Sequence, residues 1–587
     1  MWQTALTASL QAKSEAKAAG SDFSSGTHDV QLQRLEMRPL SVDDVNVETK
    51  GLHIVQTLKY KRILITGSTG FLAKVLVEKV LRNQPRIGQV YLLLRAGRYN
   101  SIQERTVDEI FDCSLFKPLR EKYGDEKYVE LVGSKVTCVS GDIGKQSLGL
   151  SSADGHLLKT TLDVIISSAA TTKFDERYDH AVNINTVGPL RLLEFAKQCT
   201  KLALFAHVST AYANGKRKGF CPEVPFEYGQ SLQQEIHQDE ANLAAAGIST
   251  PEFDPGSEIE LAFSTADKLK RMYASDDGYS PKEIIKGMVK LGSERAQMFG
   301  WTDTYTLTKA MGEQMLMKHK GDHDVPVVII RPSIVESTIR SPFDGWIQGN
   351  RMLDPIILAY GKGYLKGILG DPDNVIDMIP ADIVVNVLLA AIVKHGGYKL
   401  RKPIVYQVAS SVVNPMMGMT FRDALYDHFR KHPMASKHDS LRLVRVKYLL
   451  VVKNEAMFWF LLNALFNMPL KALRSPLWVN NGMIRKTRTT LKRNFESVKN
   501  MAVTYRPYIF YEGRFDASNS ERLLSEISDE EKDLFGYMIK DVNWDTYLKK
   551  VHIPGLRQHV LGWRQTGTFD PNWTIIDPVP ERYLPRS

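Results

Sequence analysis

The stretch Arg62–Ala73, RILITGSTGFLA, joins a short apolar run to a glycine turn and then to the start of a helical segment. Ile63–Ile65 lacks polar alternation, as expected of a strand that is buried on both faces. Leu72–Asn83 (LAKVLVEKVLRN) then has helical periodicity. Gly67 and Gly70 allow a tight turn whose backbone can approach a pyrophosphate at the start of the helix. This GxxGxxA spacing, set between a strand and a helix, predicts a dinucleotide site.

The alternation of apolar runs and helical segments continues along the chain. Further strand candidates are Gln89–Leu94, Lys135–Ser140, Asp163–Ser168, Leu202–Ser209 and Pro326–Arg331. Strands separated by helices indicate βαβ units with parallel strands. The predicted fold class is therefore α/β, with a Rossmann-type doubly wound parallel sheet.

Composition limits the classes of protein to which the chain can belong. Its 587 residues are 43% hydrophobic and 24% charged, which excludes disorder and fibrous architectures for most of its length. Four cysteines are too few for a disulfide scaffold, and none lies in a CxxC or Cys/His cluster, so a cytoplasmic setting and no metal site are expected. The net charge of +10 suits phosphate-bearing cofactors, anionic lipid or nucleic acid. Nucleic acid is not expected, because no recognition motif accompanies the basic residues.

The chain divides into regions of different composition. Residues 1–50 are predicted to form a mobile tail; a targeting peptide is the alternative, and Glu15 and Asp22 count against it. Residues 51–410 are predicted to form the nucleotide-binding domain, with a polar insertion at 215–300 that we expect near the mouth of the site. Residues 411–587 are predicted to form a mostly helical C-terminal domain.

The C-terminal region contains the most apolar stretch of the chain. Ala456–Leu470 is shorter than the ~20 residues that a membrane-spanning helix needs, and it contains Asn463 and Asn467. Basic residues flank it: Arg442, Arg445 and Lys447 before, and Arg485, Lys486, Arg488, Lys492 and Arg493 after. Such a region can lie on anionic lipid as a peripheral contact or cover an acyl chain. The alternative is a solvated helical face beside a core helix.

A tyrosine followed four residues later by a lysine occurs four times, so the spacing alone selects no pair. The pairs are Tyr123/Lys127, Tyr212/Lys216, Tyr305/Lys309 and Tyr398/Lys402. Only Tyr305 opens a strongly helical run that leads into a predicted strand, and in a helix residues i and i+4 share a face. A neighbouring ammonium favours the phenolate, so Tyr305 is predicted to exchange a proton near neutral pH. Lys309 can also hold a nicotinamide ribose; a surface pair without chemistry is the alternative.

A hydroxyl group is also needed to stabilise charge that develops on a carbonyl oxygen. Ser209 and Thr210 end the strand candidate Leu202–Ser209, at the expected edge of the sheet. Either could supply the hydroxyl, and Thr210 is preferred.

Other strand ends supply the remaining cofactor candidates, since ligands of such folds gather at the carboxyl ends of the strands. Arg95 lies about 28 residues after Gly67, where an NAD enzyme carries an acid, and its guanidinium matches a 2′-phosphate instead. Asp142 and Ile143 follow the third strand and could bracket the adenine. The remaining candidates are Ala169 and Ala170, which are small enough for close cofactor approach, and Pro332, Ser333 and Ile334, a rigid turn beside the nicotinamide.

Several stretches together resemble fatty acyl-CoA reductases, most closely the bacterial alcohol-forming kind. They are TGSTGFLAKVLVEK, YLLLRAG, HVSTAYANG, FGWTDTYTLTKAMGEQMLMK, RPSIVEST, GWIQGNRMLDPIILAYGKG and VIDMIPADIVVN. Asn543–Leu561 resembles the second domain of bacterial, plant and animal members. The resemblance covers about residues 51–565. Ala73 departs from the glycine that is usual in the family but is small enough for the same packing.

The resemblance implies an extended short-chain dehydrogenase domain that uses NADPH to reduce a long-chain fatty acyl-CoA, or an acyl carrier protein thioester, to an aldehyde and then a primary alcohol. Carried over, Gly67, Ser68, Thr69, Gly70, Phe71 and Leu72 hold the pyrophosphate, Arg95 holds the 2′-phosphate, Tyr305 and Lys309 move protons, and Thr210 binds the oxyanion. A homo-oligomer is compatible with the resemblance. The alternatives are a reductase that stops at the aldehyde, a sugar-nucleotide epimerase or dehydratase, and a cofactor-sensing binding module.

Overall fold

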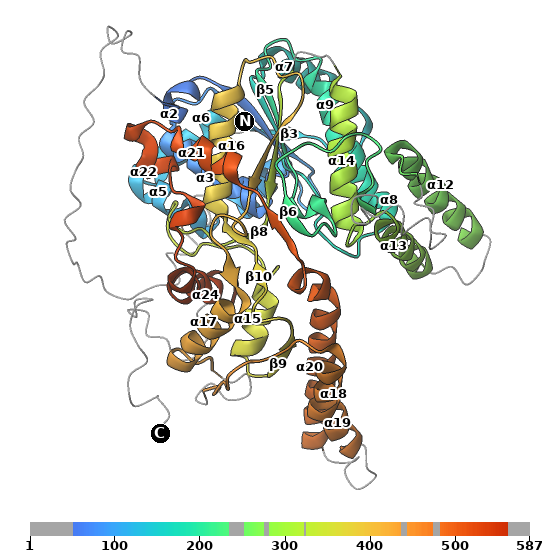
Figure 1. Cartoon of the computed structure of the whole chain (residues 1–587). Helices are drawn as coiled ribbons and strands as arrows, with labels where there is room; N and C mark the ends of the chain where they lie inside the picture. Colours follow the sequence, from blue (N-terminus) through green and yellow to red (C-terminus); the bar gives the residue numbers. More distant parts are fainter. Residues whose placement is uncertain are drawn as a thin grey trace, which may run out of the picture.

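A seven-stranded parallel sheet forms the centre of the protein (Figure 1). The computed structural model describes residues 51–233, 252–274, 281–321, 325–435, 443–473 and 482–561. The strands are β1 (Arg62–Thr66), β2 (Gln89–Leu94), β3 (Val136–Ser140), β4 (Val164–Ser167), β5 (Leu204–Val208), β7 (Val327–Pro332) and β12 (Ile404–Val408). Their spatial order is β12-β7-β5-β4-β1-β2-β3. The chain thus winds outward in both directions from β1, which confirms the predicted doubly wound sheet and creates a crevice where the direction reverses.

The sequence predicted six of these strands to within about two residues at each end and missed β12. Ile404–Val408 (IVYQV) carries Gln407, which is fully buried and interrupts the apolar run. Its side chain accepts a hydrogen bond from Asn214 Nδ2 at 2.8 Å and donates to the carbonyl of Cys221 at 2.9 Å. Tertiary partners therefore make a polar residue acceptable in a buried strand, which local periodicity does not reveal.

Helices cover both faces of the sheet, as the unbroken apolar strands require. They include α3 (Phe71–Asn83), α7 (Ser152–Thr161), α9 (Gly188–Ala196), α14 (Thr304–Lys320) and α16 (Ala381–His395). In β1, Ile63 and Ile65 pack into the core beneath α3 and α16, whereas Leu64 packs on the opposite side with α7, α9 and α14. Because side chains on both faces of the sheet are covered by helices, only the ends of the strands remain open to a ligand.

The insertion folds mainly into two helices, α12 (Pro255–Ala274) and α13 (Pro281–Met298), in the residues that the structure describes. They pack against α8 (Tyr178–Ala181) and α14 at the outer side of the domain (Figure 1). Glu258 of α12 accepts a hydrogen bond from the buried Tyr178 hydroxyl at 2.7 Å. The insertion therefore supports the helix that carries Tyr305 from outside, whereas we expected it at the mouth of the site.

The region after residue 411 is mostly helical, as predicted. Its main helices are α17 (Gly418–Lys431), α18 (Glu455–Leu462), α19 (Met468–Ala472), α20 (Gly482–Ile509) and α21 (Ser518–Ser525). Three short strands tie it to earlier parts of the chain: β13 (Met416–Met417) pairs with β10 (Val375–Ile376), β14 (Leu450–Val452) with β9 (Gly367–Leu369), and β15 (Gly513–Phe515) with β6 (Gly219–Cys221). The two parts are thus interleaved.

The apolar stretch Ala456–Leu470 forms α18, the π-helical turn η6 (Asn463–Asn467) and the start of α19. Together with α20 these helices project away from the sheet (Figure 1). No helix within the described ranges has both the length and the apolarity needed to cross a bilayer. Residues 1–50, predicted to be a mobile tail, lie outside the described residues.

Candidate active site

One cavity of about 1050 Å³ lies at the carboxyl ends of the central strands. Its volume slightly exceeds the ~300–1,000 Å³ range of small-molecule sites. The residues predicted from sequence that line it are Gly67, Ser68, Thr69, Gly70, Phe71, Leu72, Arg95, Asp142, Ile143, Ala169, Ala170, Thr210, Tyr305, Lys309, Pro332, Ser333 and Ile334. The fold therefore brings every predicted site residue to a single cavity.

The turn between β1 and α3 has the backbone that the glycine pattern predicts. Gly67 has a φ of 69°, and a Cβ atom there would lie 2.7 Å from the Cα of Ala169. Only glycine fits both the conformation and the space. Helix α3 begins after Gly70 without a side-chain cap, so its first amides remain available to an anion. The Ser68 hydroxyl instead donates to the Ile65 carbonyl at 2.9 Å and stabilises the turn.

Two guanidinium groups lie where β2 ends. Arg95 is largely exposed, and its Nη1 lies 3.8 Å from Asp142 Oδ2. Arg105, which the sequence analysis missed, donates to the Arg95 carbonyl at 2.6 Å and to Thr69 Oγ1 at 3.4 Å. Both line the cavity. No local motif marks Arg105, because it reaches the site from α4 (Ile102–Thr106), beyond the strand end.

The chain's own residues fit a nicotinamide dinucleotide at two points. The Gly67 turn provides a cradle that a Cβ atom would fill, and the buried Ser333 hydroxyl has no hydrogen-bond partner within the described structure.

The prediction of a rigid turn at Ser333 is wrong. Pro332 ends β7 and Ile334 begins β8 (Ile334–Glu336), so that only Ser333 forms a bend between the two strands. Pairing of β7 with β12 keeps Pro332 in the strand.

Tyr305 and Lys309 lie on the first two turns of α14. Asp303 caps this helix by accepting a hydrogen bond from the Thr306 amide at 2.9 Å. Lys309 is buried, and its Nζ donates to the Val208 carbonyl at 2.6 Å and lies 3.5 Å from His207 Nε2. The ammonium is thus held against the end of β5, at the wall of the cavity.

The pKa values of this pair differ from the sequence-based expectation. Burial raises the pKa of Tyr305 to about 12; the Thr210 hydroxyl opposes this rise and the charge of Asp303 adds to it. Burial lowers the pKa of Lys309 to about 8, against the attraction of Glu313. The predicted lowering of the Tyr305 pKa is therefore wrong, because desolvation dominates in this buried site. Tyr305 is a protonated phenol at neutral pH.

The two candidate hydroxyls lie in different environments. Ser209 donates a hydrogen bond to the Glu313 carboxylate. Glu313 is fully buried and pairs with Arg331, whose Nη2 lies 2.6 Å from Glu313 Oε2. The Thr210 hydroxyl lies close enough to the Tyr305 phenol to oppose the rise of its pKa. Thr210 Oγ1 also accepts a hydrogen bond from the Tyr212 amide at 3.3 Å. Ser209 thus belongs to a buried structural network, and Thr210 stands beside the phenol.

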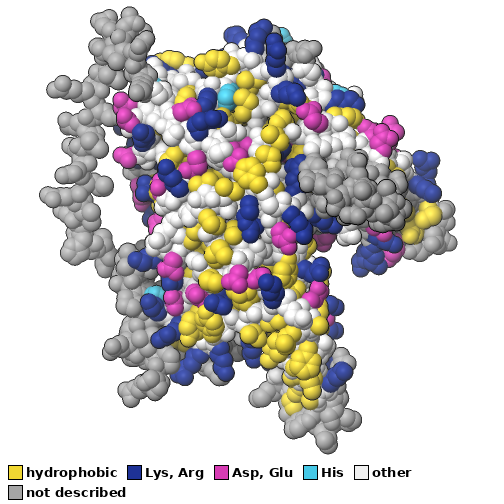
Figure 2. Space-filling view, viewed as in Figure 1, with side chains coloured by type: hydrophobic (Ala, Val, Ile, Leu, Met, Phe, Trp, Pro, Cys, Tyr) yellow, Lys and Arg dark blue, Asp and Glu magenta, His cyan; other side chains and the backbone are white. Residues whose placement is uncertain are grey.

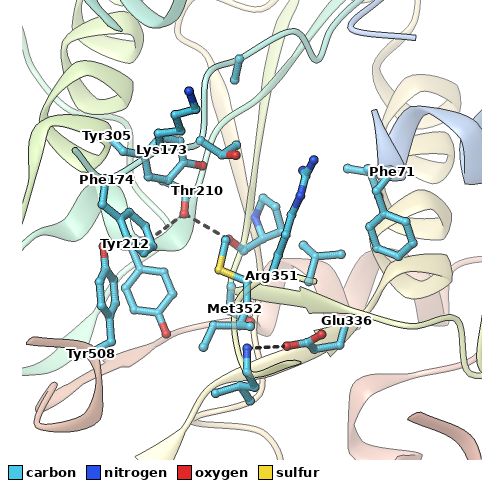
Figure 3. A pocket seen from close by; sticks show the side chains of 18 of the residues that line it. Phe71, Lys173, Phe174, Thr210, Tyr212, Tyr305, Glu336, Arg351, Met352 and Tyr508 are labelled. Carbon is cyan, nitrogen blue, oxygen red and sulfur yellow. Dashed lines mark hydrogen bonds between the residues drawn. The ribbon is translucent and has the colours of Figure 1, made fainter. Parts of the chain in front are cut away.

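An aromatic cluster beside Tyr305 was not foreseen. Phe174 lies 6.3 Å from the Tyr305 ring centroid and stacks on Tyr508 at 5.1 Å, and Tyr212 packs edge-on against Tyr508 (Figure 3). The Tyr508 hydroxyl donates to Asp303, the residue that caps the helix of Tyr305. Tyr212 appeared in sequence only as a rejected Tyr/Lys pair. No sequence motif marks Phe174 or Tyr508 as a site residue. Tyr508 reaches the cluster from the distant helix α20.

The remaining wall of the cavity is apolar and comes largely from the second half of the chain. Its apolar side chains include Ile356, Ile368, Leu369, Val375, Ile376, Phe421, Leu449 and Val451. They belong to α15 (Asp354–Gly361), β9, β10, α17 and β14, and to the residue before β14. The cavity thus combines a polar dinucleotide cradle with an apolar compartment.

Comparisons with known proteins identify the family of this chain. Family models described as "Male sterility protein" match residues 65–388, through a NAD-binding model, and residues 479–562. "Fatty acyl-CoA reductase 2, chloroplastic" from Arabidopsis thaliana is 44% identical over 88% of this chain and 80% of its own length. The chain belongs to the fatty acyl-CoA reductase family.

Other relatives of this reductase extend over most of its length. The "Alcohol-forming fatty acyl-CoA reductase" of Simmondsia chinensis is 37% identical over 86% of this chain and 99% of its own. A solved reductase domain of a Mycobacterium tuberculosis nonribosomal peptide synthetase has a TM-score of 0.50 at 16% identity, covering 86% of this chain and 95% of that one. At that identity the likeness shows the fold alone. These comparisons bear out the predicted family and a nicotinamide cofactor; the bacterial subgroup stays a prediction.

Proposed function

We propose that the protein reduces a long-chain fatty acyl-CoA to a primary alcohol through an aldehyde, with NADPH as the reductant. The observation that carries the proposal is that one cavity contains both the dinucleotide cradle and the apolar compartment, with Tyr305, Lys309 and Thr210 in its wall. The names of the relatives support the substrate class. The balanced reaction consumes one thioester, two NADPH and two protons, and releases one alcohol, one CoA thiol and two NADP⁺.

The chain's residues would handle the protons and the developing charge. When bound, the reduced nicotinamide supplies a hydride to the thioester carbonyl and, after exchange, a second hydride to the aldehyde. Thr210 and Tyr305 would donate hydrogen bonds to the carbonyl oxygen. Because the pKa of Tyr305 is raised, its phenol carries the proton that the alkoxide needs. As the resulting hemithioacetal expels the CoA thiolate, its hydroxyl proton would return to the Tyr305 phenolate, and the thiolate would take a proton from solvent, which leaves the aldehyde. Tyr305 would then protonate the alkoxide of the second reduction and regain its proton from solvent.

The preference for NADPH over NADH rests on Arg95 and Arg105. Both guanidinium groups line the cavity near the end of β2, where the ribose of a dinucleotide lies in this fold. A 2′-phosphate can pair with guanidinium groups bidentately, whereas the bare ribose hydroxyls of NADH give them no charged partner. The pair therefore supports NADPH.

Product analysis tests the function directly. Purified protein is incubated with palmitoyl-CoA and either NADPH or NADH, and the lipid products are extracted and identified. We expect hexadecanol, with two NADPH consumed per alcohol and a lower rate with NADH. Aldehyde as the final product would assign a reductase that stops after one step. Absence of net NADPH consumption would favour the epimerase alternative. A parallel assay with acyl carrier protein thioester identifies the preferred carrier.

We infer that the protein works on the cytoplasmic side of a membrane as a peripheral protein. The projecting helices α18 to α20 support this, because apolar side chains are exposed along them (Figure 2). Phe460 and Met468 are 69% and 66% exposed, and the nearby helix α20 carries the exposed basic residues Arg485, Lys486, Arg488, Lys492 and Arg493. Apolar side chains beside basic ones suit the surface of an anionic bilayer.

Vesicle sedimentation tests this surface. We expect the protein to sediment with vesicles that contain phosphatidylserine and to bind less at high salt. The double variant Phe460→Ser/Met468→Ser should bind about tenfold more weakly, with unchanged turnover of soluble acyl-CoA. Tyr398→Ser, which removes an aromatic ring that is 65% exposed elsewhere on the surface, is the matched control. Equal binding of all three proteins would show that α18 and α19 do not contact lipid.

A further inference from the structure

Three buried side chains from distant parts of the sequence converge at a wall of the cavity. They are Glu336 at the end of β8, Asp354 at the start of α15 and His552 in the π-helical turn η10 (Tyr547–His552). One ligand-type atom from each lies within 4.8 Å of the other two. Each residue is at most 1% exposed. Sequence spacing gave no sign of this cluster, because its members are far apart along the chain.

Each side chain is anchored through one polar atom and directs its other polar atom toward the same point. Glu336 Oε1 accepts from the Leu353 amide at 3.4 Å, and Asp354 Oδ2 accepts from the Arg351 amide at 3.1 Å. His552 Nδ1 lies 3.1 Å from Ser337 Oγ. Hydrogen bonds of this kind orient the ligands of metal sites.

The converging atoms lack ordinary partners. His552 Nε2 lies 3.3 Å from Asp354 Oδ1 and 3.8 Å from Glu336 Oε2, yet neither Nε2 nor Asp354 Oδ1 makes a hydrogen bond. Among the described residues, no lysine or arginine forms an ion pair with either carboxylate. Two buried carboxylates without a basic partner are stabilised either by a bound proton or by a cation between them.

We propose that Glu336, Asp354 and His552 bind a divalent transition-metal ion such as Zn²⁺. Ligands at the ~2.0–2.2 Å of a tetrahedral zinc ion are separated by roughly 3.4 Å, close to the two His552 separations. One imidazole with two carboxylates also balances the charge of the ion. Glu336 and Asp354 line the cavity, so a water on that side would supply the fourth ligand (Figure 3 shows Glu336 on the far side of Met352 from the aromatic cluster).

Such an ion joins the C-terminal family domain to the core. Glu336 and Asp354 lie within the first family match, whereas His552 lies in the second. The backbones also meet here, because a Cβ atom on Gly555 would overlap the carbonyl of Gly345. The position of His552 is therefore fixed by packing, and a preformed ligand set of this kind needs little reorganisation on binding.

Metal analysis of the full-length chain tests the site. We expect about one zinc ion per chain by mass spectrometry after dialysis in metal-free buffer. Chelator treatment should lower the Tm by about 3–5 °C, and added Zn²⁺ should restore it. Co²⁺ added to the chelator-treated protein should give visible absorption bands. No retained ion, no Tm change and no Co²⁺ bands would overturn the proposal and leave a cluster that shares protons.

Variants locate the ion. H552Q and E336Q should each bind Zn²⁺ at least tenfold more weakly than the wild type. H428Q is the matched control, because His428 is also a buried histidine at the interface with the C-terminal segment, where it contacts the Lys549 carbonyl and Arg557. It should keep the ion. Loss of the ion in H428Q alone, with H552Q and E336Q unaffected, would place the metal elsewhere and refute the assignment.

Discussion

The dinucleotide end and the apolar end of the cavity are built in different ways. Most cofactor-facing groups at the dinucleotide end follow a strand directly, so their positions are fixed by local sequence and by the parallel sheet. The apolar end is assembled by short strand pairs, such as β14 with β9 and β13 with β10, that join segments distant in the chain. Local motifs therefore fix the redox chemistry, and tertiary assembly fixes the space for the substrate.

The two ends meet at the helix of Tyr305. Tyr508 of α20 donates a hydrogen bond to Asp303, and Asp303 caps α14. The C-terminal region thus supports the position of the predicted proton donor while it also contributes to the cavity wall. Variants that alter one end of the cavity should therefore show whether cofactor binding and acyl-substrate binding change independently.

Loss of the Tyr305 hydroxyl should have the largest effect. The variant Tyr305→Phe keeps the ring and its contact with Phe174 but removes the proposed proton donor. We expect kcat to fall about 10³-fold while the KM for NADPH and for acyl-CoA changes little. The measurement is NADPH oxidation with palmitoyl-CoA, together with the Tm as a test of folding. Near-normal turnover in a folded variant would exclude Tyr305 from the proton chemistry.

A side chain at Gly67 should damage the dinucleotide end alone. In Gly67→Ala, the added Cβ would meet the Ala169 backbone at 2.7 Å, and the positive φ adds strain of about 1–2 kcal/mol. We expect the Kd for NADPH to rise about 100-fold, measured by fluorescence titration, with acyl-CoA binding unchanged.

Gly124→Ala separates the clash at Gly67 from backbone strain. Gly124 also has a positive φ, 74°, but a Cβ there has no neighbour within 4 Å. This variant should lose stability through backbone strain alone and bind NADPH normally. If both variants weakened NADPH binding equally, the close approach at Ala169 would not be the cause.

The difference between the two ends explains what the sequence could predict. The positions of six of the seven central strands, the glycine turn and Tyr305 follow from periodicity and spacing, which are local properties. Arg105, Phe174 and Tyr508 could not be predicted in the same way, because their roles depend on which distant segments pack together. The pKa of Tyr305 also required the structure, since spacing shows the neighbouring ammonium but does not show the desolvation that outweighs it.

A charge in the apolar end should affect the acyl substrate and not the cofactor. Val451 lines the cavity from β14, and Val451→Asp would place a carboxylate against the acyl chain. Because burial of an unpaired charge is unfavourable, we expect the KM for palmitoyl-CoA to rise at least about tenfold. The KM for NADPH should stay within twofold.

The preceding residue on the same strand provides the control. Leu450 is 52% exposed and does not line this cavity, since side chains alternate along a strand. Leu450→Asp should therefore leave the KM for palmitoyl-CoA unchanged. If both variants raised it equally, the effect would come from the strand pairing of β14 and not from the cavity wall.

The smallest expected effect is a change of kcat/KM with pH. It concerns Lys309, which lies on the helix where the two ends of the cavity meet. Burial lowers the pKa of Lys309 to about 8, so the ammonium is present below this pH and is lost as the pH rises through it. Because kcat/KM reports ionisations of the free enzyme, it should fall about twofold from pH 7 to pH 8 and continue to fall above. The raised pKa of Tyr305 lies beyond this range and contributes no limb. In Lys309→Arg the charge persists to a higher pH, so the alkaline fall should disappear even where the maximal rate is lower. An unchanged alkaline limb in this variant would show that another group titrates near pH 8.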